Sequence, residues 1–168
     1  RRAAVQTGLP RWRSLLAAID LGPREERAAA AGRLIDELLR AEDAPAAAAL
    51  AAETKDPLVR DRLRLRQAEL LDDARAAGDL AWELRDSPVL FDRLWWAAKL
   101  WTANGQPQRT IEIVERHLRE GKTPITLPLL ELEAAYHETG RGVDAARARP
   151  SALQRVPNPT PPAGGGFF

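Results

Sequence analysis

The stretch LWWAAKLWTANGQPQRTIEIV (residues 94–114) carries two helical patterns separated by a turn. Leu94, Ala97 and Trp101 are spaced i, i+3 and i+7, so they share one face of the first helix. Gly105 follows that helix and is expected to end it, because glycine is the residue preferred just after a helix. The stretch therefore predicts a helical hairpin.

The same arrangement recurs in LPLLELEAAYHETGRGVDAARA (residues 127–148). Gly140 follows Gly105 by 35 residues, and an aromatic residue stands four positions before each glycine, Trp101 in one case and Tyr136 in the other. Helices joined by short turns pack most readily as antiparallel neighbours. We therefore expect two equivalent hairpins side by side.

Glycine and proline divide the rest of the chain into further helical segments. Asp56 and Ser87 each precede a proline, which is the cap-then-proline start of a helix, and Gly78 is expected to end the segment that begins at Asp56. No stretch alternates with a period of two over β-branched residues, so we expect no strands. The expected helices cover about residues 10–21, 24–42, 44–54, 57–77, 80–85, 88–104, 107–120, 123–139 and 143–149.

The fold class predicted from these patterns is all-α, a stack of antiparallel helical hairpins. Residues 1–55 would form N-terminal helices that act as a cap or an irregular repeat. Residues 56–149 would form the hairpins, and residues 150–168 a tail rich in proline and glycine.

Residues 89–149 resemble the tetratricopeptide repeat, a family of stacked helical hairpins with a period of 34 residues. Three residues depart from the pattern: Glu133 and Thr110 stand where the family has a small residue, and Arg149 where it has a large apolar one. The resemblance implies an α-solenoid whose inner face binds another protein. The matching residues are Leu94, Ala97, Ala98, Trp101, Gly105 and Val114 in one hairpin and Leu129, Leu132, Tyr136, Gly140 and Ala145 in the next.

Composition excludes several classes of protein. The net charge of +1 argues against a dedicated nucleic-acid binder, and the absence of cysteine excludes disulfides, thiolate metal sites and cysteine nucleophiles. No apolar run approaches the roughly 20 residues of a membrane span. The abundance of alanine and arginine suggests a bacterial origin. The first residue is not Met, and we favour a periplasmic or cell-envelope location over a cytoplasmic one, although a trimmed chain or a domain cut fits equally.

The sequence contains only weak matches to catalytic, phosphate-binding and metal-binding motifs. The sequence EGKT (residues 120–123) resembles the end of a phosphate-binding loop, but arginine stands where that loop needs its first glycine. His117 and His137 each have a single carboxylate at helical spacing, whereas a zinc site needs three or four protein ligands. We therefore expect no catalytic residue, no bound metal and no cofactor.

The candidate partner-binding residues are aromatic and cationic. Trp95 and Trp96 lie on different helix faces from each other and from Trp101, because successive helix residues are about 100° apart. One interpretation is that all three tryptophans are core; another is that Trp95 or Trp96 lines the inner groove and anchors a partner; a third is a platform for a sugar or cofactor. The candidates are Trp95, Trp96, Trp101, Arg93 and Tyr136, with Phe167 and Phe168 in the tail.

These patterns predict a non-catalytic scaffold or accessory subunit of a larger bacterial complex, and a membrane-associated complex is one of the candidates. The alternative is a helical accessory domain of a larger enzyme, such as a cell-wall hydrolase.

Overall fold

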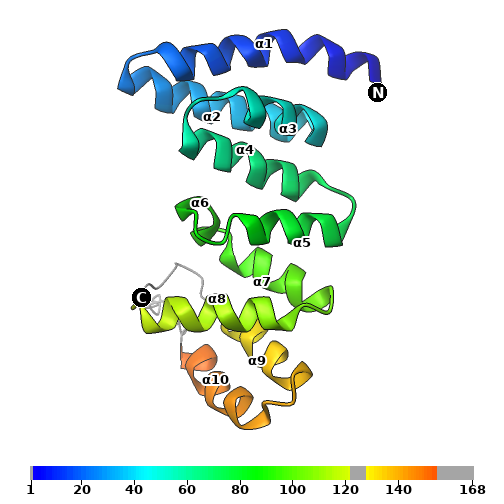
Figure 1. Ribbon diagram of the computed structural model, residues 1–168, viewed down its shortest axis with the longest axis vertical. Helices are drawn as coiled ribbons and strands as arrows, with labels where there is room; N and C mark the ends of the chain where they lie inside the picture. Colours follow the sequence, from blue (N-terminus) through cyan, green and yellow to red (C-terminus); the bar gives the residue numbers. More distant parts are fainter. Residues whose placement is uncertain (1, 122–127, 155–168) are drawn as a thin grey trace, which may run out of the picture.

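The computed structural model describes residues 2–121 and 128–154, and within them the chain is helical without strands (Figure 1). The predicted all-α class is confirmed. The helices are α1 (Arg2–Leu21), α2 (Arg24–Ala41), α3 (Ala44–Glu53), α4 (Pro57–Leu70), α5 (Ala74–Glu83), α6 (Pro88–Phe91), α7 (Leu94–Ala103), α8 (Pro107–Arg119), α9 (Leu129–Glu138) and α10 (Gly142–Gln154).

The helices follow one another along the long axis of the molecule, from α1 at one end to α10 at the other (Figure 1). Four pairs of consecutive helices pack together as hairpins: α1 with α2, α3 with α4, α7 with α8, and α9 with α10. The first helices of neighbouring pairs also touch, since α1 contacts α3 and α7 contacts α9. Between the second and third hairpins, α5 contacts both α4 and α7, and so continues the stack.

Side-chain caps start several helices as the sequence predicts. The carboxylate of Asp56 accepts hydrogen bonds from the amides of Leu58 and Val59, and the hydroxyl of Ser87 accepts one from Val89. Each cap satisfies amide groups that have no partner inside the helix, and proline at the first helical position has no amide that needs one.

Gly105 and Gly140 end α7 and α9 with the same geometry. Their φ angles are +69° and +73°, a left-handed conformation that side chains disfavour. In each turn the residue after the glycine donates its amide to the carbonyl of the aromatic residue. Gln106 donates to Trp101 and Arg141 donates to Tyr136, both at 2.8 Å. The two hairpins are therefore equivalent at their turns, as the 35-residue spacing predicts.

The prediction that Gly78 ends a helix is wrong. The helix that begins at Pro57 stops at Leu70, and Asp73 caps a new helix, α5, by accepting hydrogen bonds from two amides. Gly78 lies inside α5 and is buried, with the Trp101 ring 3.4 Å from where a Cβ atom would stand. Its role is close packing against α7 rather than termination.

Two other predicted boundaries are also corrected. The single helix expected from residue 88 to about Gly105 is two, α6 and α7, because the amide of Arg93 closes a tight turn onto Leu90 at 2.9 Å. Helix α9 begins at Leu129, and the start expected at Thr123 lies outside the described residues. Helix α10 continues through Pro150 to Gln154, where the tail was expected.

Buried side chains form three clusters along the stack. The first joins α1 to α4, the second joins α4 to α8, and the third joins α8, α9 and α10. Thr110, one of the departures from the repeat pattern, is fully buried and donates its hydroxyl to the carbonyl of Ala98 at 3.0 Å. A threonine fits this close helix contact because its polar atom is satisfied.

Two glycine substitutions test the helix assignments. Gly32 lies inside α2 with nothing within 4 Å of an added Cβ, so Gly32→Ala should raise the free energy of unfolding by roughly 0.5–1 kcal/mol. Gly105→Ala should lower it by about 1 kcal/mol because of its positive φ. Urea denaturation followed by circular dichroism measures both, and effects of the opposite signs would contradict the assignments.

Candidate partner-binding surface

Trp101 is a core residue. Its side chain is 0% exposed, and its indole Nε1 donates a hydrogen bond to the carbonyl of Gly78 at 2.8 Å. The Trp82 ring meets it edge to face, with centroids 5.6 Å apart. A ring enclosed in this way joins α7 to α5 and offers no surface to a partner.

The two neighbouring tryptophans, Trp96 and Trp95, differ in how far they are buried. Trp96 is half-buried and packs against the cluster that contains Leu94 and Trp101. Trp95 is 40% exposed, which is unusual for so large an apolar side chain. Of the three tryptophans in α7, Trp95 is therefore the one placed to contact another molecule.

A hollow between α7 and α9 is lined by residues of both helices, and one turn before Lys99, its first lining residue on α7, stands Trp95. Lys99 and Thr102 follow it at i+4 and i+7 on the same helix face. Leu130, on α9, is 65% exposed and faces the same hollow. The cavity measures about 300 Å³. Together with Trp95, its lining residues form what we call the α7–α9 groove: Lys99, Thr102, Ala103, Leu130, Glu131, Ala134 and Glu138.

Arg93 and Tyr136, the other two candidates in the described residues, are held by contacts within the chain. Arg93 pairs with Glu69 of α4 at 3.3 Å. Tyr136 is buried, and its hydroxyl donates to Glu115 at 2.8 Å while the Arg141 guanidinium stands 4.6 Å over its ring. These residues do not converge with Trp95 on the groove. Phe167 and Phe168 lie outside the described residues.

The environment of Tyr136 raises the pKa of its phenol to about 12, first because burial disfavours the charged form and then because Glu115 accepts its proton in a hydrogen bond. The neutral phenol is therefore favoured by folding: its contribution to stability is complete below pH 10 and is lost between pH 10 and 12. Since Tyr136 is the only tyrosine, absorbance at alkaline pH should report a single transition near pH 12, moving lower in Glu115→Gln. A midpoint near 10 in folded protein would contradict this contact.

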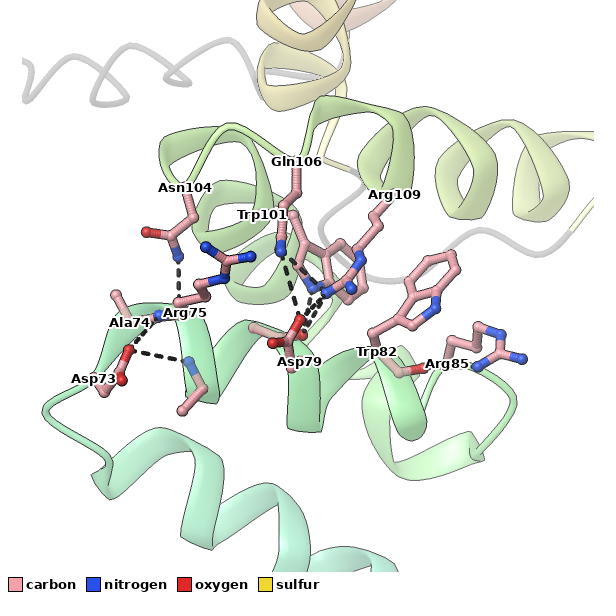
Figure 2. A network of polar contacts seen from close by, with 12 residues as sticks. Asp73, Ala74, Arg75, Asp79, Trp82, Arg85, Trp101, Asn104, Gln106 and Arg109 are labelled. Carbon is pink, nitrogen blue, oxygen red and sulfur yellow. Dashed lines mark hydrogen bonds and ion pairs between the residues drawn. The ribbon is translucent and has the colours of Figure 1, made fainter.

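A polar network fixes α5 against the turn between α7 and α8 (Figure 2). Arg109 donates to the Asp79 carboxylate at 2.7 Å, and this hydrogen bond is the main reason that the pKa of Asp79 lies below its usual value. Asn104 donates to the carbonyl of Ala74 at 2.9 Å, and the guanidinium groups of Arg85 and Arg109 stand near the Trp82 ring at 5.0 and 5.3 Å. These contacts hold α7, and with it one wall of the groove, in a defined position. Sequence reasoning missed the hydrogen bonds of Asn104 and Arg109 because each partner lies 30 residues away in the sequence.

A larger hollow, about 440 Å³, lies between α6 and α8, but its charged groups already have partners. Arg116 binds Asp86 at 2.7 Å and the carbonyl of Arg85 at 2.9 Å. His117 is buried with Nδ1 2.8 Å from the carbonyl of Ile113, and its ring packs against Phe91. In the part of the chain that the structure describes, no three histidine or carboxylate groups gather as a metal site would require.

No family model, no curated protein and no solved structure matches this chain. Within the described ranges, no helix is both long and apolar enough to cross a membrane.

Proposed function

We propose that this protein is a non-catalytic interaction scaffold or accessory subunit that binds a segment of a partner protein in the α7–α9 groove. The observation that carries the proposal is a hollow of about 300 Å³ lined by the exposed Leu130, with the exposed Trp95 one helical turn before the lining residue Lys99. Exposed large apolar side chains gathered around a concavity are typical of protein-binding sites, and tryptophan is enriched among residues that dominate binding energy.

The arrangement of helices supports the same proposal. Trp95 and Leu130 are 35 residues apart, which is also the spacing of the equivalent glycines Gly105 and Gly140. The two apolar side chains thus occupy the same position in successive hairpins, as expected of a tetratricopeptide-like stack that presents one face repeatedly. The groove is held by packed helices, so a partner would bind with little backbone movement.

Site-specific photocrosslinking tests the proposal. A photoreactive phenylalanine analogue at position 130, introduced in the native host, should crosslink to one or a few proteins, which mass spectrometry identifies. The same analogue at Leu58 is the matched control, because Leu58 is also an exposed leucine, 43% exposed, but lies on α4 away from the groove. Equal crosslinking of the same proteins at both positions, or none at position 130, would contradict the proposal.

A further inference from the structure

The α7–α9 groove combines apolar side chains with charges that have no partner in the part of the chain that the structure describes. In the residues that the structure describes, Lys99, Glu131 and Glu138 form no ion pair, whereas Glu133 on the neighbouring face of α9 stands 3.9 Å from His137. Charges that have no intramolecular partner remain available to a ligand. The lining therefore offers two carboxylates against one ammonium.

The two carboxylates lie at opposite ends of the groove, since Glu131 is in the first turn of α9 and Glu138 is its last residue, and the end at Glu138 also receives the negative ends of two helices. Ala103 and Glu138, the last residues of α7 and α9, both line it, so the carboxyl ends of two helices point to the same end. A helix carboxyl end carries a partial negative charge of about half an electron, which adds to the carboxylate of Glu138. The opposite end holds the uncharged Trp95 and Leu130, the second residues of the two helices, with Glu131 beside Leu130. There the partial positive charge of the helix amino ends opposes the charge of Glu131.

From this distribution we infer that the partner segment is basic, with a bulky apolar side chain that contacts Trp95 and Leu130 and a lysine or arginine that pairs with Glu138. The inference rests on the proposed function and specifies its partner. Leu130 and Glu138 are eight residues apart on α9, about 12 Å along the axis at 1.5 Å per residue. An extended segment advances about 3.3 Å per residue, so its cation stands three or four positions from its apolar anchor. Lys99 lies between these points and disfavours a cation in the middle of the segment.

A phage-displayed library of random short peptides, selected on the full chain, tests the inference without knowledge of the natural partner. The enriched peptides should be basic and should carry an aromatic or aliphatic residue three or four positions from a lysine or arginine. Glu131→Gln/Glu138→Gln should weaken a synthetic copy of an enriched peptide roughly five- to tenfold in calorimetric titration, since each exposed charge pair changes affinity a few-fold. Lys99→Gln should strengthen it. The matched control Asp72→Asn/Glu112→Gln removes two exposed acids elsewhere and should change nothing.

The possible outcomes separate this inference from the proposed function. Enriched peptides that are acidic or neutral, yet lose binding in Trp95→Ala/Leu130→Ser, would overturn the inference and leave the groove as the binding site. Peptides that bind equally well to Trp95→Ala/Leu130→Ser would contradict the groove itself. A selection that enriches no peptide would count against both.

Discussion

Trp101→Ala is expected to lower the free energy of unfolding by about 3–5 kcal/mol, the usual cost of removing a buried tryptophan. The ring is fully enclosed, it packs edge to face on Trp82, and its indole satisfies the carbonyl of Gly78. The substitution leaves a cavity at the contact between α5 and α7 and removes the shorter of two side-chain hydrogen bonds to the Gly78 carbonyl, which also accepts one from Arg109 at 3.5 Å. A loss of this size approaches the whole stability of a small domain. Urea denaturation followed by circular dichroism measures it.

Trp101→Phe separates the two contributions. It keeps most of the apolar ring and removes the indole donor, so its cost should be smaller than that of alanine. Trp95→Ala is the matched control on the same helix, and it should cost less than about 1 kcal/mol because its ring is 40% exposed. If Trp101→Ala were as mild as Trp95→Ala, the packing of α7 on α5 described above would be wrong.

Trp95→Ala is expected to weaken binding of the crosslinked partner about 30-fold, which corresponds to the roughly 2 kcal/mol of a binding hot spot. An exposed tryptophan buries a large apolar area when a partner covers it, and it loses little rotamer freedom because tryptophan has only two side-chain torsions. Calorimetric titration of the purified pair gives the change in affinity.

Trp96→Ala distinguishes a contact residue from a core residue in the same segment. Trp96 is half-buried against the second cluster, so its loss should lower stability and alter binding only in proportion to the unfolded fraction. A Trp95→Ala protein that binds its partner with unchanged affinity would exclude Trp95 as an anchor.

Local signals in the sequence were sufficient to predict the fold class and the turn glycines. Asp56 and Ser87 indicate helix starts because their side chains cap the amides that follow. Gly105 and Gly140 indicate helix ends because glycine readily adopts the positive φ angle found there. Gly78 shows where such reasoning fails. A glycine is favoured both after a helix and where two helices approach closely, and only the distant Trp101 ring decides between the two roles.

The candidate site was predictable only in part, for a related reason. Helical spacing separates Trp95, Trp96 and Trp101 onto different faces, but it does not say which face meets α5 and which lies open beside α9. That choice depends on the order in which helices stack. The sequence did not indicate Leu130 as a site residue, because a single leucine among apolar residues does not show whether it is buried or exposed. Only its exposed position in the hollow between α7 and α9 makes it a candidate.

Hydrogen exchange of the protein with and without its crosslinked partner tests the central claim most directly. If the partner lies in the α7–α9 groove, amides of α7 and α9 should gain protection on binding, while those of α2 and α4 should exchange at unchanged rates. Protection confined to α1–α4, or to the face of α8 beside α6, would place the partner elsewhere and contradict the account.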